Sequence, residues 1–247
     1  MIWSAFYVII KQNRIWIMEN YDYIKENLLA LTGELREYSE KYSRNITLVA
    51  VTKSGTDEEL IALAEAGVMD VGENRPQQLS RRGKLLHEKG FAPRLHEIGN
   101  LQRNKVKYII EDVSLIHSLD SFALAEEIER QAERVSRIVP VLVEINSGRE
   151  PNKGGIMPEC AEEFVRGLAK YPHLSVGGLM TMGPVCEDPE DSRVYFRLTR
   201  ELFDTIGERV GFSGEGILSM GMSDSYRVAI EEGSTLVRVG RRLFQKS

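Results

Sequence analysis

Short apolar runs alternate with amphipathic stretches along most of this chain. Residues 47–52 (TLVAVT) are apolar and rich in β-branched side chains, which predicts a buried strand. Residues 56–66 predict a helix, because Thr56 and Glu59 have the spacing of a capping box. Apolar positions at helical spacing predict another helix over residues 19–42, ahead of the first strand. We expect this first helix to cap the sheet or to pack against its last helix.

The alternation continues to the end of the sequence. It predicts strands at residues 68–71, 94–98, 115–118, 139–145, 176–180, 217–220 and 236–239, and helices at residues 75–89, 102–110, 122–135, 158–170, 189–210 and 225–232. Strands that alternate with helices are typical of a parallel sheet covered by helices. Eight such units in about 230 residues match an α/β fold, a single (β/α)8 TIM barrel with an extra N-terminal helix. A doubly wound open sheet is the alternative.

Residues 1–17 stand apart from this pattern. Their first ten residues, MIWSAFYVII, are too few to span a bilayer, which needs about 20 apolar residues. They also lack the leading positive charge and the cleavage site of a signal peptide. We therefore expect residues 1–17 to be a non-native or disordered extension that arises from an upstream start, and residues 18–247 to form the barrel domain. A membrane or partner anchor is the alternative.

Composition narrows the class of partner. The 247 residues carry 32 basic and 37 acidic side chains, a net charge of −5, without the basic excess of a nucleic-acid binder. Cys160 and Cys186 lie in no CxxC motif and the four histidines form no HExxH motif, so we expect no metal site. The low cysteine count suits a reducing cytoplasm. We expect a cytoplasmic monomer that binds neither membrane nor nucleic acid.

One lysine lies where a barrel places its active site, at the C-terminal ends of the strands. Lys53 directly follows the first predicted strand. Partial desolvation there would favour the neutral amine, which is the nucleophile that forms a Schiff base with an aldehyde. An exposed lysine without a function is the alternative.

Serine, glycine and arginine surround the last two predicted strands, where barrels often bind phosphate. Ser223 is predicted to cap a helix that begins at about residue 224, so that its hydroxyl and the free N–H groups hold a phosphate. Gly240 would let the backbone approach an anion closely. Arg238 needs a carboxylate or ligand acceptor at its strand end. The alternative is that Ser223 only caps a helix and that the glycines are turn residues without a ligand. Pyridoxal 5′-phosphate (PLP) and sugar phosphates both carry the aldehyde or carbonyl and the phosphate that such a site would bind.

Seven segments in order along the chain resemble the YggS/PROSC family of PLP-binding proteins, also called PLP homeostasis proteins. They are LVAVTKSGTDEEL at 48–60, AGVMDVGENRPQQL at 66–79, HEIGNLQRNKVKYI at 96–109, IHSLDS at 116–121, VEINSGREPNKGGI at 143–156, GLMTMGP at 178–184 and LSMGMSDSYRVAIEEGSTLVRVGRRLF at 218–244. The family is similar to the isolated N-terminal barrel domain of alanine racemase.

The resemblance implies roles for individual residues. Lys53 would carry PLP as a Schiff base, and Arg238 would face the pyridine nitrogen. Lys153 matches a lysine near the site and is an alternative acceptor for PLP. The implied cofactor-binding residues are Lys53, Asn74, Ser219, Ser223, Arg238, Gly240 and Arg241.

The resemblance also implies a carrier rather than an enzyme. Arginine donates to an unprotonated pyridine nitrogen, which makes the ring a weaker electron sink than a pyridinium. Racemases of this kind add a tyrosine from another domain, and the sequence ends at Ser247, so we expect feeble or absent racemisation and no catalytic residue. The expected function is PLP and vitamin B6 homeostasis, with PLP-dependent apo-enzymes as possible recipients. A low-activity racemase remains one alternative. The other is a PLP-free sugar-phosphate aldolase, with Glu73 and His96 as candidate acid/base groups.

Overall fold

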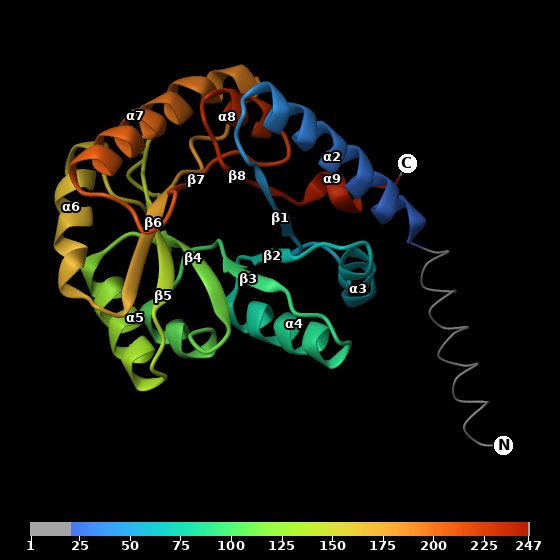
Figure 1. The fold of residues 1–247 in the computed structure, drawn as a ribbon, viewed down its shortest axis with the longest axis horizontal. Coiled ribbons are helices and arrows are strands. Elements are labelled where there is room, and N and C mark those ends of the chain that lie inside the picture. Colours follow the sequence, from blue (N-terminus) through green and yellow to red (C-terminus); the bar gives the residue numbers. More distant parts are fainter. Residues whose placement is uncertain (1–20, 247) are drawn as a thin grey trace.

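Eight parallel strands close into one barrel in a computed structural model that describes residues 21–246 (Figure 1). The strands follow one another in chain order, and β1 (Thr47–Val51) pairs with β8 (Leu236–Val239) to close the ring. The predicted barrel is therefore confirmed, and the open-sheet alternative is wrong. The predicted extension, residues 1–17, lies outside the described residues, as do residues 19 and 20 of the first predicted helix.

The other strands and the helices follow the predicted alternation closely. The remaining strands are β2 (Asp70–Glu73), β3 (Arg94–Glu97), β4 (Val113–Leu119), β5 (Val139–Glu144), β6 (Leu174–Met180) and β7 (Ile217–Ser219). The α-helices are α2 (Asp22–Lys41), α3 (Asp57–Glu65), α4 (Pro76–Glu88), α5 (Phe122–Arg134), α6 (Ala161–Gly167), α7 (Arg193–Arg209), α8 (Tyr226–Glu231) and α9 (Arg241–Phe244).

Three predicted helices differ from the structure. The segment predicted at 102–110 is the 3₁₀ helix η1 (Arg103–Tyr108) rather than an α-helix. The segments predicted at 158–170 and 189–210 contain α6 and α7 together with short 3₁₀ turns. Over so few residues, an apolar spacing of three fits either helix type, so the pattern does not separate them. The short helix α9 was not predicted.

Two apolar clusters fill the fold. The larger lies between the strands and the surrounding helices. The smaller lies inside the barrel, because its members come from strands on different sides of the ring and still pack together. Its members are Val49, Leu115, Leu142, Met180 and Leu236. Side chains at every second position of a strand lie on the same face of the sheet. Residues two positions away from a member of this cluster therefore also point into the barrel.

Helix α2 packs against α3 and against the unpredicted helix α9, rather than mainly against the predicted last helix at residues 225–232 (Figure 1). Its buried residues recur on one face, and they are Ile24, Leu28, Leu31 and Leu35. The Asn27 side-chain amide donates to the carbonyl oxygens of Leu243 and Gln245. Glu34 accepts hydrogen bonds from Arg227 and is ion-paired with Arg242. The first helix is thereby fixed to the segments around the last strand.

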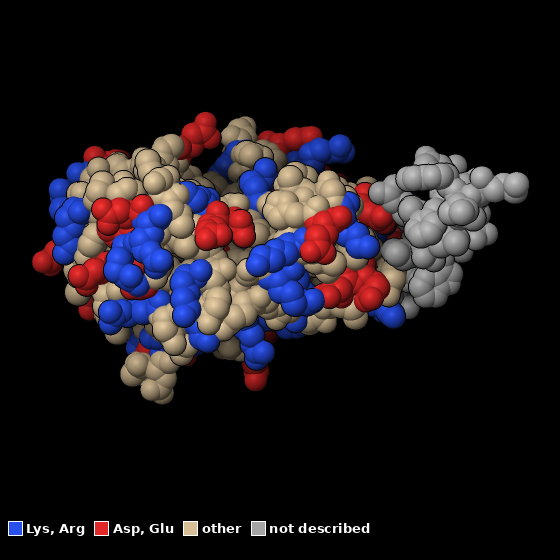
Figure 2. Space-filling model, turned by 90° about the horizontal axis from the view of Figure 1, so that it is seen from below, with Lys and Arg blue, Asp and Glu red and all other residues tan. Residues whose placement is uncertain are grey.

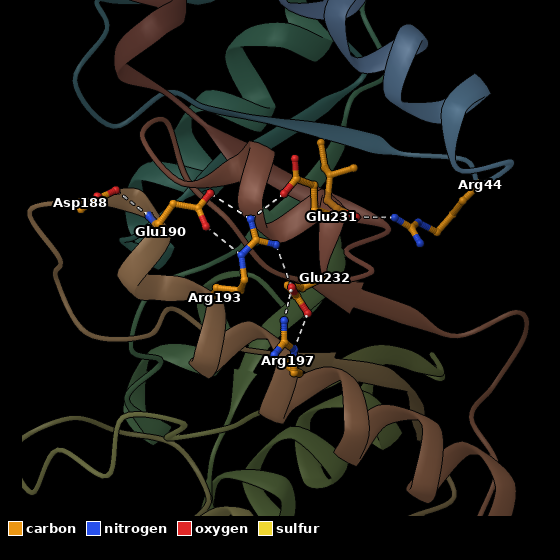
Figure 3. A network of polar contacts seen from close by, with 8 residues as sticks. Arg44, Asp188, Glu190, Arg193, Arg197, Glu231 and Glu232 are labelled. Carbon is orange, nitrogen blue, oxygen red and sulfur yellow. Dashed lines mark hydrogen bonds and ion pairs between the residues drawn. The ribbon is translucent and has the colours of Figure 1, made fainter.

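Ion pairs join helices on the outside of the barrel (Figure 3). Arg193 of α7 contacts Glu190, Glu231 and Glu232, and Arg197 also contacts Glu232. This network ties α7 to the end of α8. Positive and negative side chains are interspersed over the face that Figure 2 shows. Within residues 21–246, no helix combines the length and the apolar character that a membrane crossing requires.

Candidate functional site

A cavity of about 380 Å³ opens at the C-terminal ends of the barrel strands. The predicted site residues that line it are Lys53, Asn74, Ser223, Arg238, Gly240 and Arg241. Two larger hollows, of about 810 and 580 Å³, lie elsewhere, one between η1 and α5 and one beside α2. They contain none of the predicted residues, and we take the strand-end cavity as the candidate site because barrels bind ligands there.

Lys53 projects from a loop that is fixed on both sides. Arg82 of α4 donates to the carbonyl oxygens of Thr52 and Gly55, which flank Lys53 and Ser54. The same guanidinium is ion-paired with Glu73 at 2.5 Å, and both side chains are buried. The expected desolvation of Lys53 was wrong, because β1 ends at Val51, Thr52 takes the buried position and Lys53 is exposed. Glu73, a candidate acid, holds this loop instead.

Arg238 is a buried cation at the floor of the cavity. Its Nη1 donates to the carbonyl oxygen of Ser219 at 2.9 Å and to the Ser219 hydroxyl at 2.5 Å, and its Nη2 donates to the carbonyl oxygen of Thr181 at 3.0 Å. Burial lowers the pKa of Arg238 to about 10, against the attraction of Glu144, so the side chain stays charged near neutral pH. Ser219 therefore supports Arg238 and does not line the cavity.

Two of the five guanidinium N–H donors of Arg238 have no partner among the described residues. Because the side chain lines the cavity, a ligand atom that accepts hydrogen bonds there would satisfy them. The sequence left open whether the acceptor for Arg238 is a carboxylate or a ligand atom. Its described hydrogen-bond partners are two carbonyl oxygens and a hydroxyl, and a ligand atom as acceptor stays a prediction.

The loops after β7 and β8 meet beside this cation. The predicted capping role of Ser223 was wrong, since α8 begins at Tyr226 and the Ser223 hydroxyl instead accepts from the Gly240 N–H at 3.3 Å. A Cβ at Gly240 would lie 2.7 Å from the carbonyl oxygen of Val51, so a glycine is required where β8 ends against β1. Arg241 is exposed and pairs with Asp224 at 3.1 Å. A hydroxyl and a cation thus face the same end of the cavity.

Lys153 lies next to this cavity rather than in it. Its Nζ is ion-paired with Glu150 at 2.6 Å and donates to the carbonyl oxygen of Gly183 at 3.2 Å. It lines a smaller adjoining pocket, and Met182 lines both. The structure therefore brings Lys153 near the site without placing it on the wall that carries Lys53.

Sequence reasoning missed two groups around the site. The first is an apolar wall formed by Val51, Ile98, Met182 and Met222. The second is a pair of buried carboxyl groups at the ends of β3 and β5. Burial raises the pKa of Glu97 to about 8 and that of Glu144 to about 7, so both are partly protonated at neutral pH. Glu144 ends the apolar run VPVLV, which was an available signal, whereas Glu97 follows the mixed segment RLH and had no such signal.

His96 points into the barrel, where it contacts Asp70 and His117 at 2.9 Å each. Among residues 21–246, no group of three or more His, Cys, Asp or Glu side chains is placed to hold a metal ion. The residues that line the cavity supply an amine, two guanidinium groups, a carboxylate, hydroxyl and amide groups, and an apolar wall.

The closed barrel and its strand-end cavity define a (β/α)8 protein with a candidate small-ligand site. Residues 27–247 match the family described as "Alanine racemase, N-terminal domain". The chain belongs to this family, and the predicted resemblance to the PLP homeostasis proteins is confirmed.

Curated relatives agree on one description. A "Pyridoxal phosphate homeostasis protein" of Aquifex aeolicus is 42% identical over 197 residues, which cover 80% of this chain and 85% of the relative. A protein of the same name from Helicobacter pylori is 33% identical over 227 residues, which cover 90% of this chain and 98% of the relative.

Solved structures share the fold. PipY of Synechococcus elongatus, solved with PLP bound, is 27% identical with a TM-score of 0.78, and the match covers 90% of this chain and 100% of PipY. Alanine racemase of Clostridium difficile is 18% identical with a TM-score of 0.73, and the match covers 92% of this chain and 60% of the racemase. The second similarity concerns the fold alone.

Proposed function

We propose that this protein binds PLP on Lys53 and serves intracellular PLP homeostasis without robust catalysis. The observation that carries the proposal is the cavity on which the Lys53 amine and the Arg238 guanidinium both open. The relative from Aquifex aeolicus and PipY support PLP as the ligand, the first by its name and the second by its bound PLP.

The residues present fit this ligand at each of its ends. Lys53 supplies the amine for the aldehyde, and the unengaged donors of Arg238 suit the pyridine nitrogen, which accepts a hydrogen bond. Met182 and Met222 supply apolar walls that suit an aromatic ring. The hydroxyl of Ser223, which accepts from Gly240 and keeps its own hydrogen, would donate to the phosphate beside the cation of Arg241.

Bound PLP supplies an aldehyde that links reversibly to amines and a ring that absorbs near-visible light. The protein residues hold and orient this group. Arg238 remains protonated, so it donates to the ring nitrogen without protonating it, and an unprotonated ring withdraws electrons weakly. Asp224, the one carboxylate among the residues described as lining the cavity, is already paired with Arg241. Both features favour a carrier over a racemase.

We further propose that the protein acts as a cytoplasmic monomer and passes PLP to PLP-dependent apo-enzymes. A single chain supplies the cavity residues described above, so the site needs no partner subunit. Cys160 and Cys186 are both free thiols, which suits a reducing compartment. Sedimentation at micromolar concentration tests whether the protein is a monomer. The same experiment with an added PLP-dependent apo-enzyme tests whether the two proteins associate.

Borohydride reduction of the PLP-treated protein tests the proposal. We expect near-visible absorption that reduction removes, and a phosphopyridoxyl group on the peptide that contains Lys53. Lys53→Ala should abolish the adduct, whereas Lys84→Ala, which alters an exposed lysine of α4 outside the cavity, should leave it unchanged. A protein that remains colourless with added PLP would refute the proposal and favour the sugar-phosphate alternative. Conversion of L-alanine to D-alanine would establish the racemase instead.

A further inference from the structure

A chain of hydrogen bonds crosses the inside of the barrel and ends at the site. It links Asp70, His96, His117, Ser219 and Arg238, which lie on β2, β3, β4, β7 and β8. The Asp70 carboxylate is 2.9 Å from His96 Nε2, and His96 Nδ1 is 2.9 Å from His117 Nε2. His117 Nδ1 is 3.0 Å from the Ser219 hydroxyl, which accepts from Arg238. All five residues are buried, and none is more than 6% exposed.

With both histidines neutral, the Asp70 end of this chain fixes the direction of every hydrogen bond within it. An arginine only donates, and a carboxylate only accepts. Since Arg238 donates to the Ser219 hydroxyl, that hydroxyl is free to donate to His117 Nδ1. His117 then donates from Nε2 to His96 Nδ1, and His96 donates from Nε2 to Asp70. In this arrangement both histidines are neutral and both carry their proton on Nε2.

The surrounding charges favour this arrangement. Arg94 already donates two hydrogen bonds to Asp70, so the carboxylate is balanced without a charge on His96. Burial is the largest cause that lowers the pKa of His117 well below its ordinary value, and the positive charge of Arg238 acts in the same direction. The alternative arrangement places a proton on both nitrogens of His96, moves the proton of His117 to Nδ1 and reverses the bond to Ser219.

We propose that Asp70, His96 and His117 are positioning residues, which act through Ser219 to hold Arg238 with its free donors toward the PLP ring nitrogen. The inference rests on the proposed function, and it adds three buried residues that do not touch the cavity. The chain gives Ser219 a fixed acceptor for its own hydrogen. The hydroxyl oxygen is thereby kept as the acceptor for Arg238 and does not turn its hydrogen toward the guanidinium.

Nitrogen-15 NMR of the histidine rings tests the direction of the chain without any ligand. At pH 7.5 we expect both buried rings to be neutral and protonated on Nε2, with His117→Asn and His96→Asn used to assign the signals. A proton on Nδ1 of His117, or on both nitrogens of His96, would overturn the inference. This result does not depend on whether the protein binds PLP.

PLP titration of variants tests the positioning role. His117→Leu removes the acceptor for Ser219, and we expect PLP binding to weaken about tenfold or more, as for loss of one hydrogen bond to a charged group. His117→Asn keeps an acceptor oxygen near the position of Nδ1 and should bind within about threefold of wild type. His173→Asn, which alters a histidine paired with Glu129 outside the barrel, should have no effect.

The outcomes separate the two proposals. If the wild type takes up no PLP, the proposed function fails, and the NMR result still decides the direction of the chain. If the wild type binds PLP and His117→Leu binds it equally well, the positioning role is refuted. An equal loss of PLP affinity in His117→Leu and His117→Asn also refutes the positioning role, because an acceptor for the Ser219 hydroxyl would then make no difference. Should His117→Leu fail to fold, Ser219→Ala breaks the same link with a smaller volume change, and unaltered PLP binding in that variant counts against the inference.

Discussion

Replacement of Arg82 by methionine should destabilise the barrel and free the loop that carries Lys53. Arg82 is 3% exposed and its partner Glu73 is fully buried, at an ion-pair distance of 2.5 Å. The same guanidinium holds the carbonyl oxygens of Thr52 and Gly55. Arg82→Met therefore leaves a buried carboxylate without its counter-charge and removes one hydrogen bond from each end of the four-residue loop.

The magnitude follows from the burial of the pair. Loss of one partner from a buried ion pair costs about 3–5 kcal/mol, because the remaining charge stays desolvated. For a chain of this size, about 4 kcal/mol lowers the melting temperature by about 10 °C. The adjacent Arg81 provides a matched control, because its ion pair with Asp57 is more than half exposed on the arginine side. Arg81→Met should cost less than about 1 kcal/mol.

Chemical denaturation and the rate of PLP uptake together check this reasoning. The double variant Glu73→Leu with Arg82→Met removes both charges and should recover stability to within about 1 kcal/mol of wild type. Both Arg82→Met and the double variant should take up PLP more slowly than wild type, because each lacks the hydrogen bonds from Arg82 to the loop around Lys53. An Arg82→Met protein that unfolds within about 1 kcal/mol of wild type would refute the argument. Additive costs in the double variant would show that the two charges are not coupled.

Three further predictions concern other parts of the molecule. Burial acts to raise the pKa of Glu34, but hydrogen bonds from α8 and α9 outweigh it and lower the pKa to about 2. Glu34→Gln should therefore lower the free energy of unfolding by about 1–2 kcal/mol at pH 7. Chemical denaturation should show this difference vanishing as the pH falls from about 4.5 to 2, and a difference that stays constant would contradict the argument. Gly240→Ala forces a Cβ against the Val51 carbonyl oxygen and should weaken PLP binding at least tenfold by titration. Gly33→Ala, with open space in α2, should bind normally and gain about 0.5–1 kcal/mol. Lys153→Ala should slow PLP release in stopped-flow measurements while loading stays unchanged, if the aldehyde passes through this lysine, and equal release rates would exclude that route.

The alternation of strands and helices was sufficient to predict the barrel. Each strand must bury its side chains on both faces, so it reads as a short apolar run, and the runs fell within a few residues of the observed strands. The helix type of η1 was not predictable, because six residues fit both periods. Helix α9 is one short turn after β8, too brief to show a period.

The site was predicted less completely, for geometric reasons. Lys53 and Arg238 were identified because strand ends meet at one rim of a barrel. The exposure of Lys53 depends on where β1 ends. The strand ends at Val51, one residue earlier than predicted, and Thr52 is the last buried residue before Lys53. The chain through His117 and Ser219 was not predicted, because a strand pattern tells which side chains point inward but not which of them meet across the barrel.

The pairing of β1 with β8 also has a consequence for synthesis. Thr47 and Leu236, which face each other in this pair, are 189 positions apart, so a ribosome completes the first strand long before its neighbour exists. Until then the edge of β1 that β8 will cover stays unpaired, and such an edge invites association with other chains. The walls of the cavity come from both strands. A nascent chain therefore gains its ligand site only when the ring closes, so that uptake of the ligand marks each molecule whose folding is finished.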